Sequence, residues 1–251
     1  MPFTFSHPAL IIPLKYLPAR YVSLTGLVIG SIAPDFEKFI KMSSGNIYSH
    51  TFSGIFWFNL PLALSLAFIF HLVVRNALIN HLPVFFRSRL ERFKGFNWIR
   101  HFKANPGIVA LSIIVGSFSH ILLDSVTHSE APYIYLFPGL LKWITFGPFG
   151  SVGYVTLMWV VILSFTFSIF GLIYILYSFI TLPAEPVKET KKRTLLKFWL
   201  LVLVVACLTV FFKLTFGPDL INNWQWIYIS ISAGLMGIFS ASAFWAKVRL
   251  H

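Results

Sequence analysis

Five apolar runs dominate the chain and limit what it can fold into. Each is about twenty residues or longer, the length that a helix needs to cross the hydrocarbon core of a bilayer. The runs cover residues 52–74, 107–128, 152–181, 195–214 and 226–246. Only 11% of the 251 residues are charged, far below the quarter usual in soluble domains. The sequence therefore predicts an all-α, polytopic helical membrane protein with five full transmembrane helices.

The N-terminal part predicts a pair of shorter helical pieces. Residues 21–34 are apolar, but at about 1.5 Å per residue they reach only about 21 Å, less than a hydrocarbon core of about 30 Å. Pro34 disfavours continuation of a helix, so we expect it to end this one and to hold Asp35 in a fixed turn. Residues 8–19 then form the other arm of a short or re-entrant pair.

One compact membrane unit is the simplest domain organisation. Residues 1–150 hold most of the candidate site residues, and we expect them to form the membrane domain that carries the site. Residues 183–193, with the sequence PAEPVKETKKR, are typical of a polar linker. Residues 151–251 are expected to add three transmembrane helices to the same unit.

Basic residues give the chain a formal charge of +12 and predict its orientation. They gather in the loops 75–106 and 182–194 and in the C-terminal tail. Because cytoplasmic loops carry an excess of Lys and Arg, we place these segments in the cytoplasm and residues 35–51 outside. This bias accounts for the charge without nucleic acid as a partner, so the lipid bilayer is the predicted partner. No pattern indicates an oligomeric state.

Three ionisable residues follow one another at four-residue intervals at the end of the second apolar run. In GSFSHILLDSVTH, residues 116–128, they are His120, Asp124 and His128. Such spacing places them on one face of a helix. Ionisable groups inside a membrane are costly, and each indicates pairing or function. Imidazole and carboxylate are also ligands of zinc and related divalent ions. A simpler alternative is a histidine and an aspartate that hydrogen-bond each other at a helix end.

Other scarce ionisable residues fall at the same predicted membrane face. The topology places Asp35, His50 and Asp124 near the outer rim, with His120 about 12 Å deeper than His128. That depth suits the floor of a cleft that opens outward. A further histidine, His7, joins the group if the N-terminus begins outside.

The remaining histidines have simpler interpretations. His71 lies near the cytoplasmic end of the first run, where we interpret it as a hydrogen-bonding residue at a helix end. His81 and His101 lie in a basic loop and are expected to be solvated. The single cysteine, Cys207, excludes a disulfide within the chain and a cysteine-based zinc site.

The ordered set of His7, PDFE, SHT and SHILLDSVTH resembles the bacterial membrane-bound metal-dependent hydrolases. Those proteins carry an early His, then Pro-Asp-x-Asp, then Thr-His-Ser, then Ser-His-x3-Asp followed by Thr. The opening MPFTFSHPA together with GSIAPDFE resembles more closely an uncharacterised bacterial integral-membrane family related to those hydrolases. The whole group is similar to zinc-dependent phospholipase C. The resemblance covers about residues 1–135.

This resemblance implies a site and a location. It implies metal ligation, with zinc as the ion, by five residues: His7, Asp35, His50, His120 and Asp124. Asp35 or Glu37 is then available to take the proton of a water, and Glu37 stands where the hydrolases have a second aspartate. His128, outside the His-Asp pair, is available as a proton-transfer group or as a support to the ligands. The implied location is the bacterial cytoplasmic membrane, with the site facing outward.

Three functions remain open at this stage. The first is hydrolysis of a lipid or another phospho- or acyl-ester by a metal-activated water. The second is a non-catalytic metal-binding scaffold, in which the same ligands close a structural site. The third, a transporter with the polar stripe as its ion path, is less favoured because residues 195–214 and 226–246 contain no acid and no histidine.

Overall fold

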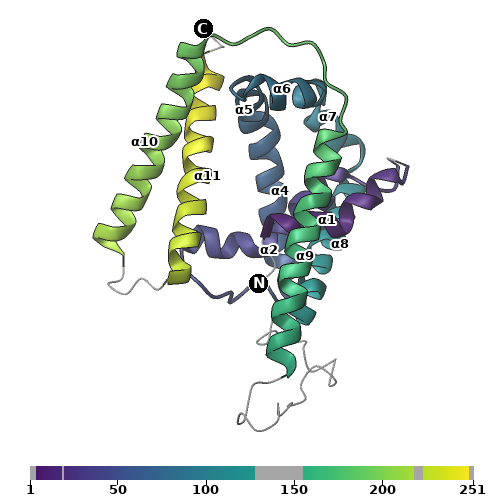
Figure 1. Ribbon diagram of the computed structural model, residues 1–251. Helices are drawn as coiled ribbons and strands as arrows, with labels where there is room; N and C mark the ends of the chain where they lie inside the picture. The colour runs from purple at the N-terminus through teal and green to yellow at the C-terminus, as the bar shows by residue number, and fades with distance from the viewer. Residues whose placement is uncertain (1–3, 19, 128–154, 218–222, 249–251) are drawn as a thin grey trace. The chain divides into compact units, whose positions relative to one another are not determined.

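The computed structural model describes residues 4–18, 20–127, 155–217 and 223–248 (Figure 1). Their regular structure is helical, and no strand occurs among them, so the predicted all-α class is confirmed. The elements in chain order are η1 (Thr4–Ser6), α1 (Pro8–Ile11), η2 (Ile12–Tyr16), α2 (Leu24–Lys41), α3 (Phe52–Gly54), η3 (Ile55–Asn59), α4 (Leu60–Ile69), η4 (Phe70–Val74), α5 (Arg75–Asn80), α6 (Val84–Leu90), η5 (Glu91–Gly95), α7 (Trp98–Ala104), α8 (Pro106–Thr127), α9 (Val155–Ile180), α10 (Lys192–Phe216) and α11 (Asn223–Val248).

Among the described residues, five helical stretches are long and apolar enough to cross a bilayer. They are Phe52–Asn80, Pro106–Ser125, Ile162–Ile180, Lys192–Phe216 and Gln225–Lys247. Each overlaps one predicted apolar run, so the chain is an integral membrane protein with the expected five spans. The short pieces α1 and η2 precede α2, in agreement with the predicted pair of shorter N-terminal helical pieces.

The first span is longer than predicted. It continues past residue 74 to Asn80 through α5, and it contains two π-helical turns, η3 and η4. Arg75 therefore lies inside the helix, where its guanidinium donates to the backbone carbonyls of Phe96 at 2.8 Å and Lys94 at 3.2 Å. These acceptors satisfy a buried cation that the sequence pattern assigns to a loop.

Two compact units make up the chain. Unit one comprises Met1–Pro34, Tyr48–Ala63 and Gly107–Phe179, and unit two comprises Asp35–Ile47, Leu64–Pro106 and Ile180–His251. The expectation that residues 1–150 carry the site and residues 151–251 add three helices stays a prediction.

Helix α2 does not end at Pro34, which corrects the predicted turn. The helix runs through the proline to Lys41, so Asp35 and Glu37 are helical residues. A proline cannot donate to the carbonyl four residues earlier, which here belongs to Gly30. That carbonyl instead accepts a hydrogen bond from the Ser117 hydroxyl of α8 at 3.0 Å. A side-chain donor from a neighbouring helix is a known way to accommodate proline in membrane helices.

Small residues bring α2 and α8 into close contact within unit one. A methyl group added to Gly30 would lie 2.4 Å from the carbonyl oxygen of Ile113, and one added to Gly116 would lie 2.4 Å from that of Leu27. Gly26 and Gly30 form a GxxxG pair on α2, and Gly116 lies on the facing side of α8. Such pairs allow membrane helices to approach closely. The Gly–Gly crossing fixes the register of α8 against α2.

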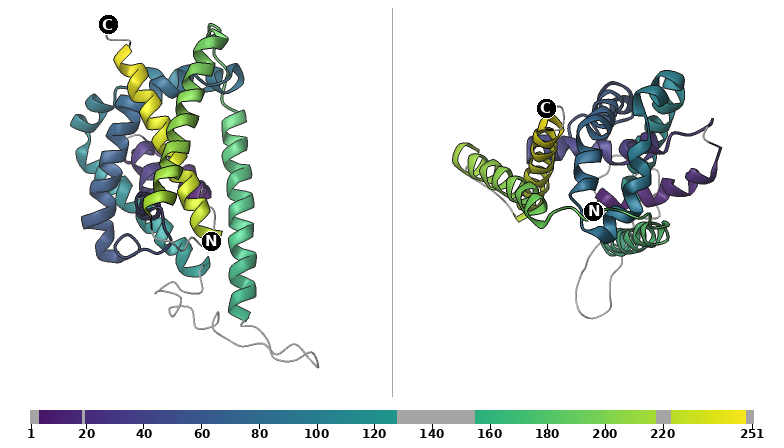
Figure 2. Two further views of the ribbon diagram at one scale, coloured as in Figure 1. Left: turned by 90° about the vertical axis from the view of Figure 1, so that its left-hand side faces the viewer. Right: turned by 90° about the horizontal axis from the view of Figure 1, so that it is seen from above.

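In unit two, α10 and α11 lie side by side in Figure 1 and in both views of Figure 2. A methyl group added to Gly237 would lie 2.5 Å from the carbonyl oxygen of Val202, so these helices also cross closely. Phe198, Val202 and Ala241 form the buried core of the pair.

Two histidines of unit two differ from their predicted environments. His81 is buried rather than solvated: its ring stacks on Phe198 with centroids 4.3 Å apart, and its Nδ1 lies 2.7 Å from the carbonyl oxygen of Ala77. His71 lies well inside the first span rather than at its end, where it contacts Arg75 at 2.9 Å and stacks on Trp98. Aromatic stacking and a backbone acceptor make these rings stable in an apolar environment.

Glu91 forms a small ion-pair network in unit two, and its protonation is expected to weaken the fold. Its carboxylate lies 2.5 Å from Lys94 Nζ and 3.5 Å from Arg87 Nε. Burial raises the pKa of Glu91, but the hydrogen bonds and charges of Lys94 and Arg87 outweigh it and hold the pKa below its ordinary value. A lowered carboxyl pKa stabilises the fold at pH values above the unfolded-state pKa, and this contribution is lost as the pH falls through the folded-state pKa.

We therefore expect Glu91→Gln to lower the unfolding temperature slightly at pH 7, by an amount that shrinks below about pH 4. The loss should not exceed about 1 kcal/mol, since the pair is partly exposed. Thermal unfolding in detergent between pH 7 and pH 3 measures it. A difference between wild type and variant that grows as the pH falls would contradict this assignment.

Candidate metal centre

Four ionisable side chains from three separate segments of unit one meet at one place. His7 directly precedes α1, His50 precedes the first span, and His120 and Asp124 lie on α8. Relative exposures are 2% for His7, 0% for His120 and 5% for Asp124. The side chain of His50 is the most accessible of the four, at 17%. The structure thus brings together His7, His50, His120 and Asp124, for each of which the resemblance implied metal ligation.

Local structure holds the two histidines that lie outside α8. Pro8 occupies the first turn of α1 and fixes the backbone directly after His7. Helix α9 packs on the neighbours of His7, since a methyl group added to Gly171 would lie 3.0 Å from Ser6 Cβ. The segment before His50 is held by Asn59, whose side-chain amide donates to the carbonyl of Ser49 at 2.8 Å.

The three imidazole rings direct the same nitrogen toward a single carboxylate. His7 Nε2 lies 3.3 Å from Asp124 Oδ1, while His50 Nε2 lies 3.1 Å and His120 Nε2 lies 3.4 Å from Asp124 Oδ2. One ligand atom each from His50, His120 and Asp124 all lie within 4.8 Å of one another. His120 and Asp124 reach the same point because residues four apart share a helix face.

The opposite ring nitrogens have acceptors of their own. His120 Nδ1 lies 2.7 Å from the carbonyl oxygen of Ser31, and His7 Nδ1 lies 3.2 Å from that of Thr4. A carbonyl oxygen only accepts, so each Nδ1 carries a proton and donates. In a neutral ring the Nε2 atom then holds a lone pair, which points at the carboxylate oxygens of Asp124. Lone pairs that face each other need a cation between them, either a proton or a metal ion.

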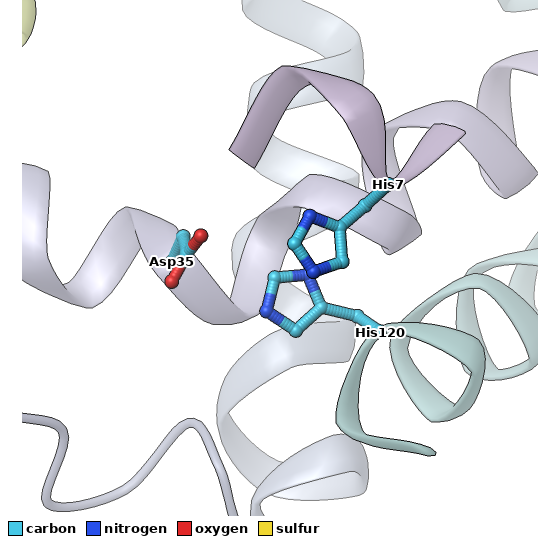
Figure 3. A group of neighbouring side chains, drawn as sticks. All are labelled: His7, Asp35 and His120. Atoms are coloured by element: carbon cyan, nitrogen blue, oxygen red, sulfur yellow. The ribbon is translucent and has the colours of Figure 1, made fainter. Parts of the chain in front are cut away.

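The stacking of two of the rings argues against protons as the only cations between these lone pairs. His7 and His120 stack with centroids 3.9 Å apart and planes 15° from parallel (Figure 3). Two imidazolium ions at this distance, buried and with one carboxylate between them, repel each other strongly. A single divalent cation neutralises the carboxylate and accepts the lone pairs of neutral rings without such repulsion. A metal-bound histidine usually donates its other ring N–H to a carboxylate, a backbone carbonyl or a water, as His7 and His120 do here through Nδ1.

Asp35 and Glu37 lie beyond the boundary of unit one, on the continuing helix α2. Asp35 is one helical turn after Ser31 along that helix and accepts from Lys38 Nζ at 2.6 Å. Glu37 accepts from the backbone N–H of Ile47 at 2.8 Å and from Lys41 Nζ at 3.2 Å. Their predicted roles as ligand and base stay predictions, and His128 lies outside the described residues.

Several residues that orient the rings were missed by the sequence analysis. Ser31 and Thr4 act through backbone carbonyls, which no side-chain pattern reveals. A signal existed for Ser49, whose hydroxyl lies 3.0 Å from His50 Nδ1. It directly precedes His50, and serine also precedes His7 and His120 in the sequence.

The fold and this cluster together define a helical integral membrane protein with a buried histidine–aspartate centre. The chain belongs to the DUF4184 family, described as a domain of unknown function, whose model matches residues 1–246. Membership of an uncharacterised family is therefore confirmed. No curated protein and no solved structure matches the chain.

Proposed function

We propose that unit one binds a divalent metal ion, zinc by its donor set, through His7, His50, His120 and Asp124. The observation that carries this proposal is the convergence of three Nε2 atoms on one buried carboxylate while two of the rings donate Nδ1–H to carbonyls. Imidazole nitrogens with one carboxylate oxygen are a ligand set typical of catalytic zinc.

The spacing of the donors agrees with zinc. Bonds of about 2.0–2.1 Å at tetrahedral angles separate neighbouring donor atoms by about 3.3 Å. His50 Nε2 and His120 Nε2 lie 3.1 and 3.4 Å from one carboxylate oxygen, Asp124 Oδ2, close to this separation. His7 Nε2 lies 3.3 Å from the other oxygen, Oδ1. Asp35, one turn beyond Ser31 on α2, is proposed as a fifth ligand, in keeping with the resemblance to membrane-bound metal-dependent hydrolases.

We further infer that the centre hydrolyses an ester of a lipid or another phospho- or acyl-ester. When bound, zinc would lower the pKa of a coordinated water toward neutrality, and the ion would itself polarise an ester oxygen. His50, the most accessible of the four residues, lies two positions before the first span begins at Phe52. This position at the boundary of a membrane span favours a substrate that resides in the bilayer. Asp35 or Glu37 is proposed to accept the proton of the water, with His128 as a proton-transfer group.

A non-catalytic metal-binding scaffold is the second candidate. The burial of His7, His120 and Asp124 favours it, because a structural metal site is closed to water. Both candidates share the same ligands and differ only in turnover.

Hydrolysis of phosphodiester and phospholipid substrates by the zinc-loaded full chain separates them. We expect the wild type to turn over at least one substrate and His120→Gln to lose about a hundredfold or more of that rate, since a metal ligand is removed. His101→Gln, the same change at a half-buried histidine of unit two, should retain the wild-type rate. Zinc binding without turnover on any substrate would favour the scaffold.

A further inference from the structure

Residues 81–105 of unit two, the connecting segment, join the first two membrane spans. The chain leaves one span at Asn80 and enters the next at Pro106, so both ends of the segment lie at a bilayer surface. The segment contains six Lys and Arg residues and one acid, Glu91, which is paired with Lys94 and Arg87. Its position and charge point to the lipid headgroups as a binding partner.

Contacts with the first span fix the depth of the connecting segment. Arg75 donates to the carbonyls of Lys94 and Phe96, and Lys94 Nζ donates to the Asn80 side chain at 2.8 Å. The span from Phe52 to Asn80 has 29 residues, about 43 Å of helix, which matches a bilayer with its headgroups. Arg75 is about 7–8 Å from the end of this helix, which is roughly the thickness of one headgroup layer.

The segment is anchored on one side and exposed on the other. Trp98 is buried and stacks on His71 of the first span. Large apolar side chains nevertheless remain 39–49% exposed: Val84, Phe85, Phe86, Phe93, Phe96 and Ile99. Three cations are also exposed, namely Arg92, Arg100 and Lys103. Arg100 and Lys103 line an open groove together with Asn97, Ile99 and Ala104.

We propose that the connecting segment binds anionic phospholipids. Arg92, Arg100 and Lys103 contact lipid phosphates, and the rings of Phe93 and Phe96 insert at the level of the upper acyl chains. Aromatic rings and cations that lie side by side suit the boundary between headgroups and acyl chains, because the rings favour the apolar acyl chains and the cations favour the charged headgroups. This proposal does not rest on the proposed metal centre.

Native mass spectrometry of the full chain from micelles of equal phosphatidylglycerol and phosphatidylcholine tests the proposal. Each cation near an anionic surface contributes about fivefold in affinity. We expect R92Q/R100Q/K103Q to lower the ratio of retained phosphatidylglycerol to phosphatidylcholine about tenfold or more. The control K188Q/K191Q/K192Q removes the same charge from exposed lysines around 183–193, a stretch without aromatic residues. Loss of general surface charge is common to both variants, so we expect the control to lower the ratio clearly less than R92Q/R100Q/K103Q does.

Amide exchange in nanodiscs gives a second readout on the same proteins. Exchange of residues 92–103 should be slower in discs that contain phosphatidylglycerol than in phosphatidylcholine discs, for the wild type and the control but not for R92Q/R100Q/K103Q. The proposal would be overturned if the lipid ratio were equal in the wild type and this variant, or if the control lost as much as the variant. It would also be overturned if amide exchange of the wild type were the same in both kinds of disc.

Discussion

Asp124→Asn is expected to lower the affinity of the chain for zinc at least about a hundredfold. The carboxylate contacts all three imidazole rings, and asparagine keeps its shape while removing the charge that balances a dication. Loss of a group that merely orients a ligand costs about 10–100-fold in metal affinity, so loss of a ligand should cost more. Zinc content after loading and dialysis, together with titration calorimetry, measures the effect.

Matched variants separate ligand loss from general damage. Glu189→Gln removes one exposed carboxylate of unit two and should leave zinc binding unchanged. Zinc should raise the unfolding temperature of the wild type and of this control, because a ligand that binds only the folded state stabilises it. Asp124→Asn should still elute as a folded species but lose this response. A wild type that retains no zinc, manganese or iron under any loading condition would remove the metal centre altogether.

Hydropathy alone located the spans, because a bilayer imposes a minimum apolar length on every crossing helix. Helical spacing likewise placed His120 and Asp124 on one face of α8, since residues four apart are neighbours on a helix surface. The approach of His50 to Asp124 was expected from their predicted depth in the membrane, whereas that of His7 was expected only if the N-terminus begins outside. In the structure each of the three histidines contacts Asp124. Their role as metal ligands stays a proposal.

The predictions were wrong where a residue far away in the sequence supplies a hydrogen bond or a packing contact that a rule based on neighbouring residues does not consider. Pro34 should end a helix because it leaves the carbonyl of Gly30 without a donor, but Ser117, far away in sequence, supplies that donor. His81 has basic neighbours in the sequence, but the ring of Phe198 on α10 covers it. Such pairings depend on which helices pack together, and neither composition nor periodicity of one segment contains that information.

Gly116→Ala is expected to destabilise unit one by at least about 2–3 kcal/mol and to weaken zinc binding with it. The new methyl group would lie 2.4 Å from the carbonyl oxygen of Leu27 and 2.7 Å from the backbone nitrogen of Ser31. These are backbone atoms, so the added carbon forces α2 and α8 apart and costs more than a side-chain rearrangement would. The same separation withdraws the Ser31 carbonyl from His120 Nδ1 and releases the orientation of that ring.

The matched control for this prediction is Gly107→Ala on the same helix, where an added methyl group meets nothing within 4 Å. Both changes restrict the unfolded chain equally, so the difference between the two variants isolates the steric conflict at the α2–α8 crossing. Gly107→Ala should be neutral or up to about 1 kcal/mol more stable, because alanine favours helix over glycine. Unfolding temperatures in one detergent and zinc titrations of both proteins measure the difference. Equal stability of the two variants would show that α2 and α8 do not pack at Gly116, and the orientation of His120 by Ser31 would lose its structural basis.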